Sequence, residues 1–185
     1  MSTTTKKALA SSLKNKLKEK ALDKITITDL CEECGVNRQT FYYHFQDIYD
    51  LIEWIYTDEA SRVIADKKSY RNWEEGYLRI FEYALEEKDF AISTYHSISR
   101  EHLENFLYRE TYQVLYHVIE EMSKHLSIRE EDKAFIANFY KYAFVGIILD
   151  WVRRGMVENP QYIVKETAIL MEGNVAQAIK RFCTK

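Results

Sequence analysis

The stretch ITITDLCEECGVNRQTFYYHF, residues 25–45, predicts two short helices joined by a tight turn. Thr26 can cap the first helix, with Asp29 three residues later as in a capping box. Gly35 can end that helix in the left-handed conformation without a Cβ penalty. Asn37 can cap a second helix of about two turns. Two short helices separated by a glycine turn are typical of a helix-turn-helix.

A Cys-x-x-Cys pair, Cys31 and Cys34, lies in the first of these helices. Zinc sites generally need four ligands, and Cys183 is the only other cysteine in the chain. A redox pair of the thioredoxin kind expects a βαβ context, which this sequence lacks. At positions i and i+3 the two thiols share a helix face, where free cysteine behaves as a small hydrophobe. We expect core packing, with a metal or redox site as the alternative.

The composition of the 185-residue chain favours an all-α protein. Five Gly and one Pro are too few for a many-stranded β fold, which needs frequent turns. No window approaches 18 consecutive apolar residues, and the N-terminus lacks an apolar signal segment. We therefore expect a cytoplasmic protein with reduced thiols and no contact with a membrane.

Basic residues are concentrated near the N-terminus. Residues 1–46 hold eight Lys and Arg against five Asp and Glu, whereas the remainder holds 18 against 24. A mildly basic segment on an acidic protein suits contact with a polyanion, although counts this small also arise by chance.

Apolar residues recur at helical spacing through the rest of the chain. Asp47 is a further N-cap, and Pro160 suits a helix start. Helices are expected over about residues 4–19, 48–65, 73–88, 89–98, 100–126, 130–155 and 161–182. We divide the chain into a head, residues 1–47, and a body, residues 48–185, joined directly by the helix from Ile48.

The head resembles the DNA-binding domain of the TetR family of transcriptional regulators. The match covers about residues 8–55, and its strongest elements are Thr26, Leu30, Gly35, Val36, Thr40, Phe41, Tyr42, Tyr43, His44, Phe45 and Leu51. The resemblance implies a three-helix helix-turn-helix head on an all-helical body for effector binding and dimerisation. Within the family, YYHFQDIYDLIEWIY, residues 42–56, is similar to regulators of dihydroxyacetone kinase operons.

One position departs from the family pattern. The family often has a lysine at the start of the fourth helix, near the DNA phosphates. Here that position is Ile48, and Asp47 and Asp50 flank it. The backbone N–H groups of this helix end can still donate to phosphate.

The second helix of the motif supplies the expected contacts to bases. Arg38 and Gln39 lie in its first turn, where Arg can pair with guanine and Gln with adenine. Tyr42 can contact a base edge, a thymine methyl or a phosphate, or pack against the first helix. For Arg38 and Gln39 the alternative is a solvated surface.

The remaining predicted contacts go to the DNA backbone. The resemblance implies that Thr40 and Tyr43 bind phosphates, which fixes register without reading sequence. Thr26 and Thr28 begin the helix that should cross the backbone, with simple capping as the alternative. His44 is expected to be structural or to contact a phosphate.

The resemblance implies that the last two long helices pair with their mates in a four-helix homodimer interface, with the intramolecular core as the alternative. The predicted interface residues are Phe135, Phe139, Ala143, Gly146, Ile147, Ile163, Thr167, Leu170, Met171 and Asn174.

The resemblance also implies an effector pocket in the body. Candidate lining residues are Tyr77, Phe81, Tyr95, His96, His102 and Phe106, although an aromatic stripe at this spacing is more often core.

Three functions compete at this stage. The favoured one is a dimeric regulator that binds palindromic double-stranded DNA and is switched by a small-molecule effector or a co-regulator protein. The second is an enzyme. The sequence contains no P-loop, dinucleotide fingerprint, HExxH or nucleophile elbow, so we expect no enzyme, catalytic residue, metal or cofactor. The third is a helical protein–protein adaptor that has lost specific DNA binding, which the acidic flank of Ile48 favours.

Overall fold

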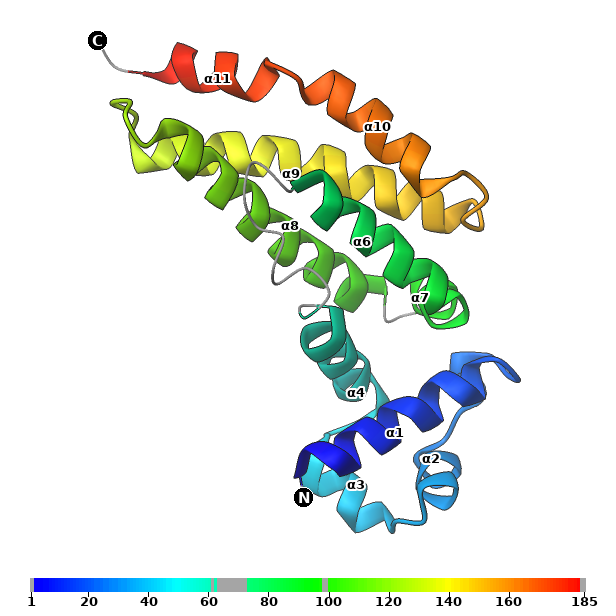
Figure 1. Ribbon diagram of the computed structural model, residues 1–185. Coiled ribbons are helices and arrows are strands. Elements are labelled where there is room, and N and C mark those ends of the chain that lie inside the picture. Colours follow the sequence, from blue (N-terminus) through cyan, green and yellow to red (C-terminus); the bar gives the residue numbers. More distant parts are fainter. Residues whose placement is uncertain (1, 61, 63–72, 98–99, 184–185) are drawn as a thin grey trace.

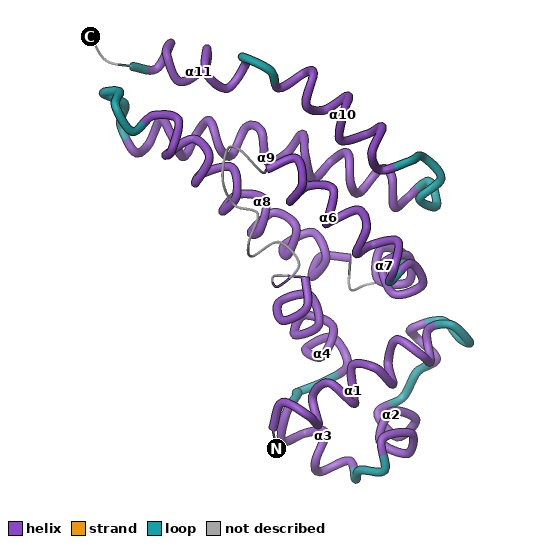
Figure 2. The backbone as a smooth tube through the Cα atoms, viewed as in Figure 1, coloured by secondary structure: helices purple, strands orange, loops and turns teal. Residues whose placement is uncertain are grey.

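A computed structural model describes residues 2–60, 62, 73–97 and 100–183 of the chain (Figure 1). All regular elements within these residues are helices (Figure 2), which confirms the predicted all-α class. The head contains α1 (Ser2–Leu17), the 3-10 turn η1 (Leu22–Lys24), α2 (Ile27–Cys34) and α3 (Arg38–His44). The body begins with α4 (Ile48–Ile55) and the π-helix η2 (Tyr56–Ala60), followed by α6 (Trp73–Glu86), α7 (Lys88–Tyr95), α8 (Arg100–Ser123), α9 (Glu130–Arg153), α10 (Pro160–Met171) and α11 (Asn174–Phe182).

The helix ends of the head are where local chemistry predicts them. The Thr26 side chain accepts a hydrogen bond from the Asp29 amide, and the Asp29 carboxylate accepts one from the Thr26 amide, which completes the capping box. The Asn37 and Asp47 side chains cap α3 and α4 by accepting from the amides three residues later, at 2.8 and 2.9 Å. Gly35 ends α2 with φ of 65°, in the left-handed region.

One apolar core holds the head together. Its fully buried side chains come from α1, α2, α3 and α4 and include Leu9, Leu13, Leu30, Phe41 and Leu51. Cys31 is buried in the same core, its thiol donates weakly to the Asn37 carbonyl (3.7 Å), and burial raises its pKa. All three cysteines are free, and no group of three or more potential metal ligands occurs within the described ranges. The pair therefore packs as small apolar residues.

The body is built around α8 and α9, which lie side by side over most of their length (Figure 1). The α6 and α10 helices pack together on this pair, and α7 contacts both α1 and α9. In length and composition α9 is the one described helix that could cross a membrane, yet 44% of its most apolar window is buried in the protein. Core helices of globular proteins meet the same criteria, so this is weak support for a span.

The α4 helix joins the head to the body without an intervening loop. Its residues Leu51, Ile52 and Ile55 are fully buried, and it packs on both α1 and α8. Because α4 packs on helices of both the head and the body, its packing does not assign it to either one. The division after residue 47 therefore stays a prediction. The predicted helix of residues 48–65 instead changes to π-helical hydrogen bonding at Tyr56, and its predicted end lies outside the described residues.

The predicted last helix, residues 161–182, is wrong as a single element. The chain leaves the helical conformation at Glu172, which has ψ of 117°, and Gly173 follows with φ of 73°. The left-handed backbone at Gly173 separates α10 from α11. The break turns α11 to run along α8 and α9, where Val175 and Ile179 are buried.

Candidate nucleic-acid interface

The α3 helix lies at the end of the head farthest from the body (Figure 1). Phe41 anchors it, because this ring is fully buried and contacts the Phe45 ring at 5.8 Å. Arg38 and Gln39, one turn before this anchor, are exposed. Tyr43 is 82% exposed, which is unusual for so large a ring. The helix therefore presents its first turn and the aromatic side chains of Tyr42 and Tyr43 to solvent.

Arg38 and Tyr42 form a loose pair on this surface. The guanidinium carbon lies 6.0 Å from the Tyr42 ring centroid, and Nη2 donates to the phenol oxygen at 3.4 Å. Tyr42 is 51% exposed, so a ligand can reach both groups. Packing of the covered half of the ring against the first helix stays the alternative to a DNA contact. The long hydrogen bond leaves the Arg38 guanidinium free to turn outward.

The predicted backbone-contacting residues differ in how much of their hydrogen-bonding capacity is free. The Thr40 hydroxyl donates to the Asn37 side-chain oxygen (3.0 Å), so it must release this bond before donating to a phosphate. The Thr26 hydroxyl accepts from the Asp29 amide and keeps its own proton to donate. Thr28 is exposed, and the half-buried His44 contacts the Tyr43 ring edge-on at 4.9 Å.

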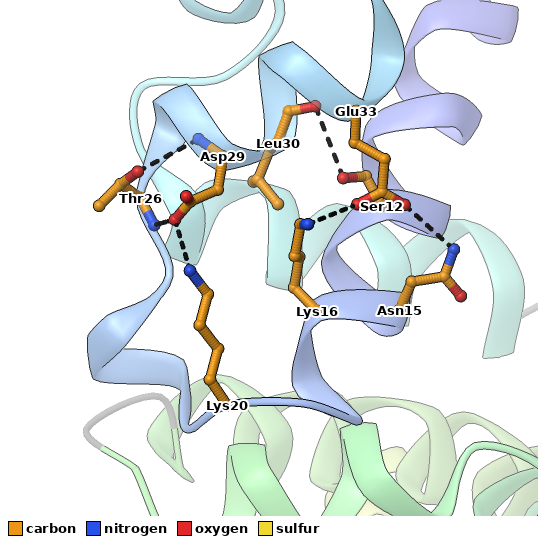
Figure 3. Close-up of polar contacts among 8 residues, drawn as sticks. All are labelled: Ser12, Asn15, Lys16, Lys20, Thr26, Asp29, Leu30 and Glu33. Atoms are coloured by element: carbon orange, nitrogen blue, oxygen red, sulfur yellow. Dashed lines mark hydrogen bonds and ion pairs between the residues drawn. The ribbon is translucent and has the colours of Figure 1, made fainter.

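Polar contacts fix α2 against α1 (Figure 3). The Lys20 ammonium lies 2.8 Å from Asp29, and together with the Thr26 amide it holds the Asp29 pKa well below its usual range. On the neighbouring turn Lys16 and Asn15 both contact the Glu33 carboxylate. The Ser12 hydroxyl donates to the Leu30 carbonyl. These contacts hold the first helix of the motif at a fixed angle, and they neutralise some of the basic charge of the head.

The start of α4 is occupied by its own caps. Asp47 accepts from the Asp50 amide, and the Asp50 carboxylate accepts from the Gln46 amide at 2.9 Å. Two carboxylates here oppose the approach of a phosphate, and Ile48 brings no cation. The predicted phosphate contacts are therefore those of α2 and α3.

Known proteins identify this arrangement. Residues 15–55 match the family model for bacterial regulatory proteins of the tetR family, and residues 71–173 match that for a transcriptional regulator C-terminal region. The second match alone spans more than half of the chain. The chain belongs to the TetR family. It is a transcriptional regulator and not an enzyme, and members of its family bind DNA and typically act as dimers.

A curated relative and two solved structures extend the comparison. The HTH-type dhaKLM operon transcriptional activator DhaS of Lactococcus lactis subsp. lactis (strain IL1403) is 26% identical over 153 residues, covering 82% of this chain and 81% of that protein. The structure of dihydroxyacetone kinase operon activator DhaS superposes with a TM-score of 0.74 at 23% identity, covering 97% and 98% of the two chains. NalD, a secondary repressor of the MexAB-OprM efflux pump in Pseudomonas aeruginosa, superposes with a TM-score of 0.60 at 13% identity, covering 100% and 99%. These structural likenesses establish the fold.

This TetR-family regulator carries an exposed apolar stripe on α9. Phe135 and Phe139 are 61% and 66% exposed, and Ala143 and Gly146 continue the stripe at helical spacing. Tyr142, 60% exposed on the same face, was not among the predicted residues, although its spacing of seven from Phe135 places it there.

The predicted residues of α10 and α11 divide between surface and core. Leu170 is 70% exposed and Asn174 is exposed, whereas Ile163, Met171 and the α9 residue Ile147 are half-buried. Thr167 is buried and its hydroxyl donates to the Ile163 carbonyl, so it cannot face a second chain. Tyr162 and Ile169 are exposed on α10 as well, and neither was predicted.

The six predicted pocket residues do not share one cavity in the part of the chain that the structure describes. Tyr77 borders a cavity of about 20 Å³ and donates to the Phe144 carbonyl (3.0 Å), and Phe106 lines another of about 40 Å³. Phe81 and Tyr95 are buried, and Phe81 packs edge-on against Trp151 at 4.8 Å.

The two histidines of the set lie near the surface. His96 is exposed at the end of α7, and His102 is half-buried, stacked on Tyr49 and 3.6 Å from Glu53. A cavity of about 440 Å³ between Trp73 and helices α8 to α11 contains none of the six residues. Helical spacing groups residues of one helix, but a cavity needs side chains from several helices.

Proposed function

We propose that this regulator binds a palindromic operator as a homodimer, with the first turn of each α3 in the major groove. The observation that carries the proposal is the outward display of Arg38 and Gln39 on a helix held by the buried Phe41. Both side chains can form two hydrogen bonds to one base, Arg to guanine and Gln to adenine. Tyr42 adds a contact to a base edge or a thymine methyl.

Backbone contacts would orient this helix. Tyr43, almost fully exposed, and Thr28, in the first turn of α2, are free to bond phosphate oxygens. Thr26 can join them with its free hydroxyl proton, Thr40 can do so once it releases Asn37, and the His44 ring contacts the Tyr43 ring edge-on. The acidic start of α4 leaves this set with fewer cations than the family pattern provides.

The exposed stripes of α9 and α10 support the dimer. Phe135, Phe139 and Leu170 expose large apolar areas that a soluble chain covers when it can. A β-carbon placed on Gly146 would meet nothing within 4 Å, so a partner helix can approach this position closely. Two heads about one DNA turn or a multiple apart read a palindrome, whereas one head contacts few base pairs.

We further infer that the operator lies at a dihydroxyacetone kinase operon, as the name of the Lactococcus relative suggests. An effector or co-regulator protein would shift the population between body conformations in which the two heads do or do not match the half-site spacing. A protein that works on the chromosome in this way resides in the cytoplasm.

Footprinting on the upstream region of that operon tests the proposal. A footprint with two-fold symmetry is expected, and its affinity should fall steeply with salt because phosphate contacts release counterions. Arg38→Ala should cost about 1–3 kcal/mol and relax the preference at one base pair.

Tyr43→Phe is the matched comparison, because it removes one hydroxyl and keeps the ring. It should weaken binding about equally on all sequences. Salt-insensitive binding, or none to any upstream fragment, would instead support the adaptor function.

A further inference from the structure

The exposed surface of α3 carries little positive charge for a surface that meets a polyanion. Arg38 is the one lysine or arginine in this helix, and the start of α4 adds the carboxylates of Asp47 and Asp50. Cations that neutralise phosphates supply most of the sequence-independent affinity for DNA. A head that binds DNA therefore needs cations from another helix that borders this surface.

The lysines of α1 differ in whether a carboxylate already neutralises them. Lys14 and Lys16, in the C-terminal half of the helix, each lie within 3.3 Å of a carboxylate oxygen, and so does Lys20 in the turn that follows. Lys6 and Lys7, in the N-terminal half, have no ion pair among the described residues. The free positive charge of α1 is therefore concentrated at one end of the helix.

That end of α1 lies beside α3 (Figure 1), and α1 packs on α4 as well. The Lys6 Nζ atom lies 5.2 Å from the ring centroid of Phe45, directly after α3, and 5.7 Å from that of Trp54 on α4. Both distances are within the range of about 6 Å over which an aromatic ring attracts a cation. The two rings also contact each other, with centroids 5.9 Å apart. The ammonium is thus held where three helices of the head meet.

The contact with the rings leaves the Lys6 ammonium able to bind an anion. A lysine ammonium has three N–H donors, and its attraction to a ring face uses none of them in a bond to oxygen. Lys6 is half-buried, as expected where the aliphatic stem covers the rings and the charge stays in water. A side chain that is already held in place also loses less freedom when it binds.

A row of ring contacts links Lys6 to the predicted phosphate contacts of α3. The Phe45 ring lies 6.3 Å from the His44 ring, which lies 4.9 Å from the ring of the exposed Tyr43. Successive phosphates of one DNA strand advance about 3.4 Å along the duplex axis. A strand that contacts Tyr43 can therefore reach Lys6 within a few nucleotides.

We propose that the Lys6 ammonium, positioned by the rings of Phe45 and Trp54, binds a backbone phosphate of the operator. It supplies from α1 a cation that Ile48 does not supply at the start of α4. The inference rests on the proposed function and adds a contact from a third helix to those of α2 and α3.

The salt dependence of binding to the footprinted fragment tests this contact, with Lys6→Met as the variant. Methionine is unbranched and can keep the packing on the rings without the charge. Each lost phosphate contact lowers the slope of log affinity against log salt by about 0.9, so two heads give about 1.8. Between roughly 50 and 200 mM salt, the wild type should therefore lose about twelvefold more affinity than Lys6→Met. Lys6→Arg should restore the wild-type slope, because arginine keeps the charge and stacks on aromatic rings.

The matched control is Lys88→Met, which removes the same charge from an exposed position at the start of α7, in the body. It should leave the slope unchanged. An equal fall in slope for Lys88→Met would overturn the proposal, because net charge and not a contact would then be the cause. A lower melting temperature of Lys6→Met with the wild-type slope would also overturn it, because Lys6 would then only stabilise the head.

A double-mutant cycle with Trp54→Leu tests the positioning by the rings. Trp54→Leu should weaken DNA binding several-fold in the wild type and much less in the Lys6→Met background, because the ammonium that the ring positions is then absent. Equal effects in both backgrounds would show that the ring does not act through Lys6.

The wild-type result separates this inference from the proposed function. A symmetric, salt-sensitive wild-type footprint with an unchanged slope for Lys6→Met would overturn only the Lys6 contact. Absent binding by the wild type would overturn the proposed function and this contact together.

Discussion

Phe139→Ala should weaken the proposed dimer about a thousandfold. Phe139 is 66% exposed in the single chain, and a phenylalanine side chain buries roughly 200 Å² when covered, so about 130 Å² would be covered by the partner. At about 25 cal/mol per Å² this area is worth about 3 kcal/mol, of which alanine keeps about a third. Because both chains of a two-fold dimer carry the substitution, the loss occurs twice and totals about 4 kcal/mol for the dimer.

Sedimentation equilibrium over a wide range of protein concentration measures this loss directly. Leu85→Ala is the matched control, because Leu85 is an exposed apolar side chain (38%) on α6, outside the proposed α9 and α10 interface. It should leave the dissociation constant unchanged. Far-UV circular dichroism of both variants should match the wild type, since surface truncations rarely disturb a helical fold.

The reasoning would be refuted by a Phe139→Ala dimer that dissociates like the wild type, with Phe139→Asp equally inert. The α9 stripe would then not be the contact between chains. Loss of dimer in the Leu85 control would show instead that association responds to any apolar truncation of the body.

Three further predictions concern stability. Gly35→Ala should cost about 1–2 kcal/mol and lower the melting temperature by several degrees, because φ of 65° opposes a β-carbon although the space around it is open. Gly35→Asn should cost less, because asparagine tolerates this conformation better. Equal melting temperatures of the wild type and both variants would contradict this. The pKa of Asp29 is lowered in the folded chain by the Lys20 ammonium, so its contribution to stability is complete above about pH 4 and is lost as pH falls through the folded-state pKa. Acid titration followed by circular dichroism should show a smaller loss for Lys20→Met, and identical curves would rule out this pair as the cause. Tyr77→Phe should cost about 1 kcal/mol in denaturant unfolding by removing the bond to the Phe144 carbonyl, and a neutral result would mean that this bond adds nothing to folding.

The caps and the turn of the head were predictable because their partners are close in sequence. Thr26 and Asp29 form their capping box within one helical turn, and Gly35 needs only its own backbone angles. The apolar role of Cys31 followed from the same helical spacing. Each of these features is set by contacts over three or four residues, which the amino-acid order specifies directly.

The body was less predictable, because its contacts join residues far apart. Tyr77 bonds to a carbonyl 67 positions away, and the Lys14–Glu87 contact spans 73 positions. The break at Gly173 was missed because a glycine inside an apolar pattern can either continue a helix or end it. Packing of α11 against α8 and α9 decides between the two.

By itself, the sequence determined the helical class, the helix-turn-helix and the family to which the chain belongs. Helical spacing and capping depend on residues close in sequence, so they can be recognised without knowing the tertiary contacts. Only the tertiary structure decided which apolar faces are left uncovered, where the cavities lie and which side chains connect head to body. Those properties depend on which helices meet, and periodicity along one helix carries no information about its partner.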